Sequence, residues 1–358
     1  MKSKIASLQI LRAFAAILVV INHLWGDSKT AFGLKLGLEY IGDFGVDAFF
    51  ILSGFIMGYK TRDDSTLGIS TGFDFIRRRI ERIYPILLII LVPFVLLYLK
   101  QTRDISLYEI IGNILLLPSF NNNPQYHMLI GPSWSLVYEM FFYVVYALIM
   151  MMVNSKRQLI IYSSVLLIGM VLLDKILSLQ GPELGMVNFS HMIGDPLMIN
   201  FAMGCLFSQL FVKMKSIQFA ILPASAAILA LFVFGMWLNA KGVPRFFCFG
   251  LPAMAIVFIF SVMKASETKT YNLLVYLGNA SYSIYITHFF IEVMAGVIFF
   301  HLKINKDLYG ILMSLFCLVC GALFYSLIEK RVTRIIQRLE TKPGGIRQVF
   351  TRLFSSKT

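Results

Sequence analysis

Ten apolar runs of 17 to 22 residues alternate with short polar segments along the chain. A run of this length is enough for an α-helix to cross the apolar core of a bilayer, which is roughly 30 Å thick. The runs lie at residues 8–26, 40–59, 83–99, 133–153, 158–177, 193–212, 217–238, 246–263, 280–301 and 307–328. With 58% hydrophobic residues, 14% charged residues and a mean hydropathy of +0.76, the composition excludes an ordinary soluble domain. The pattern predicts an all-α polytopic membrane protein with about ten transmembrane helices.

The positive charge gathers on one side of these predicted spans. If both termini are cytoplasmic, the inner segments hold 22 Lys and Arg and the outer segments hold eight, as the positive-inside rule requires. The same rule accounts for the net charge of +13, so no nucleic acid partner is expected. An eleventh crossing at residues 105–117 would spoil this balance, and we expect that stretch to lie in or along the outer interface.

The carboxyl-terminal segment differs in character from the rest. It mixes Arg with Ile, Leu and Phe, as in RVTRIIQRLE, which is typical of an amphipathic segment on an anionic inner leaflet. We therefore predict a membrane domain over residues 1–330 and a basic amphipathic cytoplasmic tail over residues 331–358.

The first apolar run, LQILRAFAAILVVINHL, contains two ionisable residues, Arg12 and His23. Their spacing is about three helical turns, so both lie on one helix face, about 16 Å apart along the axis. Ionisable side chains inside a span are costly, and they mark a functional site by default. Alternatively, Arg12 anchors the helix at the inner headgroups and His23 is a hydrogen-bonded residue near the outer interface.

Polar residues also mark the second and third spans. Asp47, in GVDAFFILSGFIM, lies in the outer half of the second span, near the depth expected for His23. It either orients His23 and raises its basicity, or neutralises or caps a neighbouring helix. Four arginines in FIRRRIERIYP belong to the expected inner loop 60–82, where they anchor the topology or clamp the phosphate oxygens of an anionic ligand. They are Arg77, Arg78, Arg79 and Arg82.

The fourth span begins with aromatic and polar residues around a carboxylate. Glu139 lies about two turns into this span, in PSWSLVYEMFFY. It is a candidate general base, a clamp for a sugar hydroxyl, or a structural partner. Trp134, Ser135 and Tyr138 precede it, and they form either an interfacial belt or a surface for a sugar ring.

The stretch YLGNASYSIYITHFFIE leads into the ninth span, and in it Tyr282 and His288 follow a predicted helix break at Gly278 and Asn279. A second histidine at mid-membrane depth indicates a site, although a helix-to-helix hydrogen bond is the alternative. The four cysteines lie in or beside apolar runs, and their one CxxC has no second pair, so no metal is expected.

Taken in order and spacing, five stretches resemble the membrane acyltransferase-3 family over residues 6–330. They are LQILRAFAAILVVINHL, GVDAFFILSGFIM, FIRRRIERIYP, WSLVYEMFFY and LGNASYSIYITH. Arg12 and His23 match the R-x(10)-H signature of that family. SGFIM together with WSLVYEMFFY is most similar to the exopolysaccharide-production O-acetyltransferase branch.

The resemblance implies a multi-pass enzyme of the bacterial inner membrane. It would move an acetyl or other short acyl group from acyl-CoA, with acetyl-CoA the expected donor, to a hydroxyl of a cell-surface or exported polysaccharide or its lipid-linked precursor. Some family members carry an additional SGNH-type hydrolase domain. This sequence shows none, so we expect the membrane unit to present the acyl group to the carbohydrate directly.

Acyl transfer from a thioester to an alcohol needs a base for the hydroxyl, a clamp for the donor phosphates and stabilisation of an oxyanion. The expected catalytic residues are His23, Glu139 and Asp47. The expected donor-binding residues are Arg12, Arg77, Arg78, Arg79 and Arg82, and the expected acceptor-binding residues are Trp134, Ser135, Tyr138, Tyr282 and His288. The same arginines would also suit a transporter or flippase of an anionic lipid-linked sugar, and a non-catalytic scaffold is a third possibility.

Overall fold

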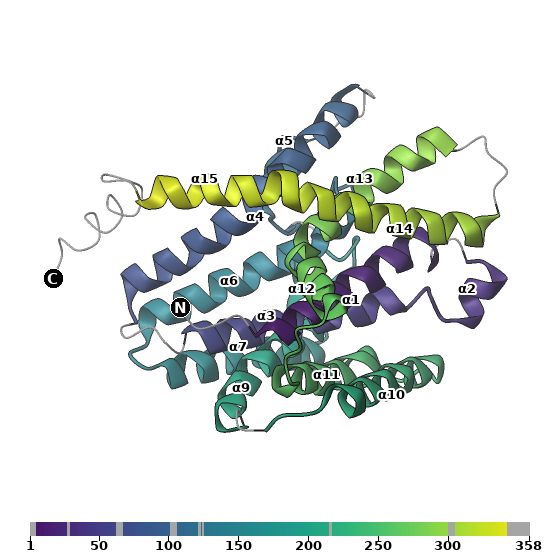
Figure 1. Ribbon diagram of the computed structural model, residues 1–358. Coiled ribbons are helices and arrows are strands. Elements are labelled where there is room, and N and C mark those ends of the chain that lie inside the picture. The colour runs from purple at the N-terminus through teal and green to yellow at the C-terminus, as the bar shows by residue number, and fades with distance from the viewer. Residues whose placement is uncertain are drawn as a thin grey trace. The chain divides into compact units, whose positions relative to one another are not determined.

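The computed structural model describes residues 5–26, 29–61, 67–100, 106–120, 123, 125–214, 217–299 and 305–341. Within these ranges the chain is mainly helical (Figure 1), and extended segments pair through two isolated bridges, Ser119 with Asn188 and Phe219 with Met263. Seven helices of the described chain are long and apolar enough to cross a membrane, and two shorter apolar helices accompany them. The expected all-α fold is therefore confirmed for the described residues, and the long apolar helices are consistent with the expected membrane protein.

The chain forms two compact units, and each unit is built from two stretches of sequence. The first unit comprises residues 1–59 and 195–323, and the second comprises residues 60–194 and 324–358. The helices of the first unit are α1 (Ala6–Leu24), α2 (Ala31–Lys35), α3 (Ile41–Thr61), α9 (Leu197–Met214), α10 (Ile221–Ala240), the π-helical η3 (Phe246–Gly250), α11 (Leu251–Val262), α12 (Lys269–Asn279), α13 (Ser281–Phe299) and α14 (Lys306–Phe324). Those of the second are α4 (Ile69–Lys100), α5 (Leu107–Leu115), the 3₁₀ turn η2 (Gly131–Ser133), α6 (Trp134–Met152), α7 (Lys156–Leu177), α8 (Phe189–Gly194), the π-helical η4 (Tyr325–Glu329) and α15 (Lys330–Thr341).

Each of the ten predicted apolar runs lies on a helix. The predicted start of the third helix, at residue 83, is wrong. We expected a loop to residue 82, whereas α4 begins at Ile69, so all four arginines are helical. Arg77 shows why a polar stretch stays helical, because it pairs with Asp74 at 3.4 Å and with Glu81 at 2.8 Å, one turn away in each direction. With 32 residues, α4 is about 48 Å long, which exceeds the roughly 30 Å of a bilayer core.

Shorter helices, among them α5, α12 and α15, occupy segments between or after the predicted spans. Within the segment expected at the outer interface, α5 has nine residues, too few to cross a bilayer. We expected a loop before residue 280, but α12 forms there, and it ends at Asn279 beside the predicted break. The predicted tail is helical over α15, which begins at Lys330, and residues 342–358 lie outside the described residues. Contact of the tail with the inner leaflet remains a prediction.

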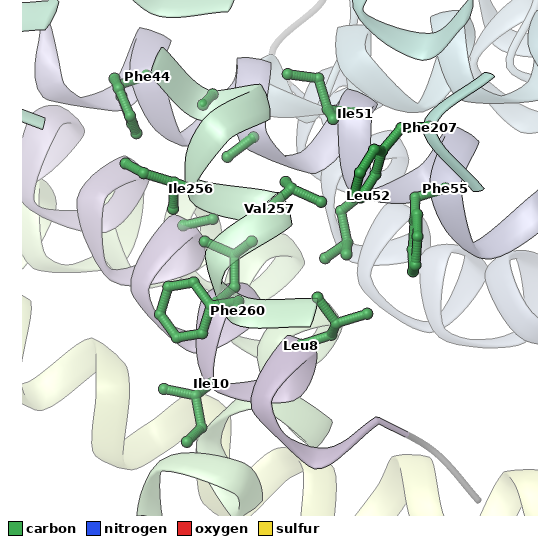
Figure 2. Packing of buried hydrophobic residues seen from close by; sticks show 14 of the residues in the cluster. Leu8, Ile10, Phe44, Ile51, Leu52, Phe55, Phe207, Ile256, Val257 and Phe260 are labelled. Carbon is green, nitrogen blue, oxygen red and sulfur yellow. The ribbon is translucent and has the colours of Figure 1, made fainter. Parts of the chain in front are cut away.

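The core of the first unit lies where α1, α3, α9, α11 and α12 pack together (Figure 2). Large buried side chains fill it: Leu8, Ile10, Phe44, Ile51, Leu52, Phe55, Phe207, Ile256, Val257 and Phe260. On α1 the small residues Ala13, Ala15 and Ala16 are also buried. Small side chains let neighbouring helices approach closely, so α1 is suited to a central place in this unit.

Two glycines allow α3 and α9 to cross at close range. A Cβ atom on Gly54 would overlap the carbonyl oxygen of Phe201, and one on Gly204 would overlap the carbonyl oxygen of Ile51. Cys205 also donates from Sγ to the carbonyl oxygen of Gly54 at 3.3 Å. Because the obstacles are backbone atoms, any larger residue at either position has to push the two helices apart.

We predict that Gly54→Ala lowers the free energy of unfolding by about 1–3 kcal/mol, the range typical of overpacked cores. The thermal unfolding midpoint of the detergent-purified protein measures this effect. Gly169→Ala on α7 is the matched control, since a Cβ atom there meets no atom within 4 Å, and alanine favours a helix. Equal midpoints for the two variants would contradict the prediction.

Candidate functional site

In the first unit, the polar stripe of α1 lies along α13. Arg12 donates from Nε to Oγ of Ser281, the first residue of α13, at 3.1 Å. Further along both helices, the rings of His23 and His288 lie 5.2 Å apart between centroids, at an interplanar angle of 34°. The earlier residue of α1, Arg12, contacts the earlier residue of α13, Ser281, and the later residue His23 contacts the later residue His288. The helices α1 and α13 therefore run in the same direction. The structure therefore brings Arg12, His23 and His288 onto one seam.

His288 is fully buried on α13. Its Nδ1 lies 2.5 Å from the carbonyl oxygen of Tyr285, one turn earlier, and the two rings are in edge contact at 5.8 Å. Phe49 on α3 packs against Tyr285 at 6.2 Å. His23 and Tyr282 are half-buried. The seam is thus enclosed at His288 and more open at His23. A substrate that reacts at His23 requires such an opening.

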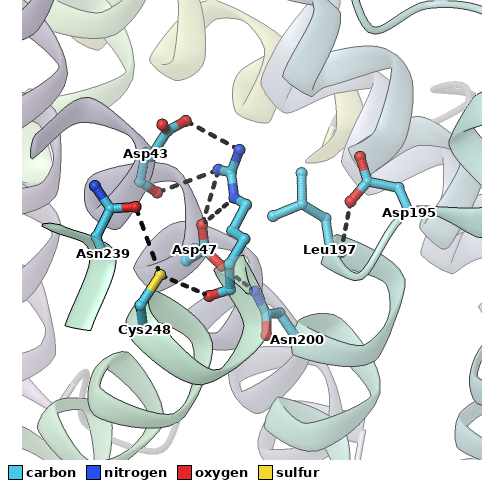
Figure 3. Close-up of polar contacts among 8 residues, drawn as sticks. Asp43, Asp47, Asp195, Leu197, Asn200, Asn239 and Cys248 are labelled. Carbon is cyan, nitrogen blue, oxygen red and sulfur yellow. Dashed lines mark hydrogen bonds and ion pairs between the residues drawn. The ribbon is translucent and has the colours of Figure 1, made fainter. Parts of the chain in front are cut away.

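Asp47 belongs to a polar network on the other side of α3 (Figure 3). Its carboxylate has no exposed surface, and it accepts from Nε and Nη2 of Arg245 at 2.9 and 2.8 Å and from Nδ2 of Asn200 at 2.5 Å. Arg245 also pairs with Asp43 at 2.9 Å. The arrangement is the one expected if Asp47 neutralises a cation from a neighbouring helix. A role in orienting His23 remains a prediction.

Sequence reasoning missed Arg245, which we counted among the cations of an outer loop. It lies directly before η3, and 27% of its side chain is exposed. Asp47 itself could have indicated that such a residue exists, because a buried carboxylate in an apolar helix needs a cation or several hydrogen-bond donors. Arg245 is the arginine that immediately precedes an apolar run on the same side of the predicted membrane.

In the second unit, the four arginines of α4 have different surroundings. Arg77 is engaged by the two carboxylates of its own helix described above. Arg79 lies over the ring of Tyr143 on α6 at 4.9 Å and over that of Phe75 at 5.1 Å. The side chains of Arg78 and Arg82 are exposed. Arg78 and Arg82 are therefore open to an anionic ligand, whereas Arg79 is held against aromatic rings.

The carboxylate of Glu139 lies beside this aromatic support. Tyr143 donates its hydroxyl to Glu139, one turn earlier on α6, and Arg79 rests on the ring of the same tyrosine. Glu139 is half-buried. The structure therefore places Glu139, expected to be catalytic, and Arg79, expected to bind the acyl donor, on the same tyrosine. The spacing of residues in the sequence did not reveal this association.

The aromatic residues at the start of α6 differ in exposure. The ring of Trp134 meets that of Tyr138 edge-on at 5.5 Å, and Ser135 donates to the carbonyl oxygen of Pro132 at 3.3 Å. Trp134 and Ser135 are half-buried, whereas Tyr138 has no exposed surface. Of these three residues expected to bind the acceptor substrate, Trp134 and Ser135 are partly exposed to a ligand, and Tyr138 packs against the tryptophan.

An acyltransferase domain, characteristic of the acyltransferase-3 family, matches residues 5–328. The chain belongs to the acyltransferase-3 family. It is 25% identical over 257 residues to the exopolysaccharide production protein ExoZ of Rhizobium meliloti, covering 70% of this chain and 76% of that protein. It is 30% identical over 158 residues to the acyltransferase MdmB of Streptomyces mycarofaciens, covering 40% of this chain and 39% of that protein. No solved structure matches.

This acyltransferase-3 protein is therefore an enzyme that transfers acyl groups. Family membership decides against the transporter or flippase that the arginines alone would also suit. Among the residues that the structure describes, no group of three or more His, Cys, Asp and Glu is placed to hold a metal ion.

We predict that Arg245→Ala destabilises the enzyme by about 3 kcal/mol or more, because it leaves the buried Asp47 carboxylate without its cation. Adding Asp47→Asn to that variant should restore most of the loss, since a neutral amide is less costly to bury. Thermal unfolding of the two single variants and the double variant measures the coupling. Arg78→Ala removes an exposed arginine and is the control. A midpoint for Arg245→Ala equal to that of Arg78→Ala would contradict the prediction.

Proposed function

We propose that this acyltransferase is an integral-membrane O-acyltransferase of the bacterial inner membrane. It moves an acetyl or other short acyl group from acyl-CoA to a hydroxyl of a cell-surface or exported polysaccharide or its lipid-linked precursor. The observation that carries the proposal is the seam of α1 and α13, where Arg12 bonds Ser281 and the His23 ring meets the His288 ring. A half-buried imidazole fixed on such a seam is suited to act as a base.

In the proposed reaction, His23 takes the proton of the acceptor hydroxyl as the hydroxyl oxygen attacks the thioester carbonyl carbon. The new C–O bond forms and the C–S bond breaks, so the CoA sulfur leaves with the bonding electron pair. The proton held by His23 then passes to that thiolate. The products are an ester and free CoA thiol, and His23 returns to its neutral form. A positioned base of this kind contributes roughly 10²–10⁴-fold to the rate.

The proposed topology has ten spans and two cytoplasmic termini. It assigns Arg12 to the inner half of α1 and His23 to the outer half. The common direction of α1 and α13 supports this topology, because the first and ninth of ten spans both run from inside to outside. The arginine-bearing part of α4 is then cytoplasmic, where acyl-CoA is made. In this arrangement Arg78, Arg79 and Arg82 bind the donor phosphates, while Arg77 contributes less.

A carbohydrate acceptor is supported by the relative named for exopolysaccharide production and by the half-buried aromatic start of α6. Trp134 offers a flat face to a sugar ring, and Tyr282 on α13 is a second candidate. Glu139, held by Tyr143, is suited to accept a hydrogen bond from a sugar hydroxyl. We assign Glu139 and Asp47 to supporting roles in turnover, and His23 to the proton transfer.

We predict that His23→Ala abolishes acyl transfer while the protein still inserts and accumulates. The assay uses purified enzyme in nanodiscs, labelled acetyl-CoA and polysaccharide extracted from cells that lack the enzyme. The expected result is a fall of roughly 10²–10⁴-fold in ester-linked label. Asn22→Ala, which removes the neighbouring polar residue on α1, is the control for insertion. Near-normal esterification by His23→Ala would refute His23 as the base, and acetyl-CoA binding without any ester formation by the wild type would refute the reaction.

We predict that Arg79→Ala or Arg82→Ala weakens CoA binding by about 10- to 100-fold, because charge-assisted contacts to phosphate contribute about 1.5–3 kcal/mol each. Lysine at either position should restore affinity only in part, since it lacks the planar guanidinium fork. Calorimetry on correctly inserted protein measures the affinity. Arg157→Ala, an exposed arginine in the first turn of α7, is the control. Unchanged affinity in both Ala variants would show that these arginines only anchor the helix.

A further inference from the structure

The ring of His288 is held in a defined protonation pattern by its own helix. A carbonyl oxygen can only accept a hydrogen bond, so the 2.5 Å contact with the Tyr285 carbonyl requires a proton on Nδ1 of His288. In the neutral ring the lone pair is then on Nε2. That Nε2 is buried and receives no hydrogen bond within the part of the chain that the structure describes. An acceptor left in this state is costly, which implies a donor that reaches it.

The ring that faces His288 belongs to His23. The two rings are direct neighbours, with a centroid separation of 5.2 Å and a tilt of 34°. His23 is half-buried, whereas His288 is held by the Tyr285 carbonyl and fully buried. The donor that best fits the Nε2 lone pair is therefore a ring N–H of His23.

We propose that His288 is the positioning residue of His23: its Nε2 accepts a hydrogen bond from one ring nitrogen of His23 and thereby leaves the lone pair of the other nitrogen for the acceptor hydroxyl. The tautomer of a histidine is set by the hydrogen bond that its second nitrogen makes. A base in the wrong tautomer presents a proton where a lone pair is required, and its turnover falls steeply. This inference rests on the proposed function, and it gives His288 a role other than the acceptor contact expected from the sequence.

The same arrangement serves the proton transfer. When His23 takes the hydroxyl proton it carries N–H groups on both sides, and His288 Nε2 still accepts one of them. The other N–H then faces the sulfur of the leaving group. His288 neither gains nor loses a proton in this cycle, because its Nδ1 keeps the proton that it donates in a hydrogen bond to the Tyr285 carbonyl. A neutral acceptor suffices for this role and avoids burying an additional carboxylate.

Two amide substitutions separate positioning from structure. Glutamine places its amide near the position of Nε2 and offers an oxygen acceptor there, whereas asparagine places its amide near Nδ1 and can still donate to the Tyr285 carbonyl. We expect His288→Gln to keep most of the turnover. His288→Asn and His288→Leu should lower kcat by about 10- to 100-fold, as the loss of an orienting partner does at other imidazoles, with the KM values for both substrates little changed. Equal kcat values for the Asn and Gln variants, or a Gln variant as slow as the Leu variant, would overturn the proposal.

Nitrogen NMR of histidine-labelled enzyme tests the geometry without relying on activity. We expect a single neutral tautomer of His23 in the wild type and in His288→Gln, and a mixture of tautomers in His288→Leu. Thermal unfolding of each variant shows whether the fold is intact. If His23→Ala is inactive but the His23 tautomer is the same in the wild type and in His288→Leu, the positioning role alone is wrong. If His23→Ala keeps its turnover, the proposed base is wrong and the positioning role fails with it.

Discussion

Polar groups inside apolar helices need partners, and this requirement determines how the first unit is assembled. Asp47 on α3 has no exposed surface, and its partners come from two other elements, Arg245 before η3 and Asn200 on α9. Arg12 on α1 likewise reaches Ser281 at the start of α13. An unpaired charge or amide in such surroundings costs several kcal/mol. These bonds therefore specify which helices become neighbours, whereas apolar side chains pack with little preference among helices in lipid.

The helix α1 combines a packing face with a chemical stripe. Ala13, Ala15 and Ala16 are buried and allow α3, α11 and α12 to come close, while Arg12 and His23 are half-buried along the seam with α13. Because the two faces are separate, substitutions on the stripe need not disturb the core. Such a division lets a nearly continuous apolar segment hold two ionisable side chains in a fixed register.

Most of the fold could be predicted from the sequence, because run length and hydropathy report directly on helices that have to be apolar to cross a membrane. Hydropathy does not report where a helix ends, so the polar first turns of α4 and the whole of α12 were missed. For the site, the stripe of Arg12 and His23 followed from spacing alone. The partners of Asp47 did not, because Arg245 is 198 residues away and no local pattern records such a pairing. The ring contact between His23 and His288 is tertiary for the same reason.

The division of the first unit into residues 1–59 and 195–323 has a consequence for biogenesis. Ribosomes add about 5–20 residues per second, so Arg245 emerges roughly 10–40 s after Asp47. During that interval the early helices are in place with their polar groups still waiting for later partners, while the second unit's first stretch is being made. Assembly of the first unit is thus necessarily delayed until late in synthesis. The translation rate therefore sets how long α1 and α3 lack the partners that come from the later stretch.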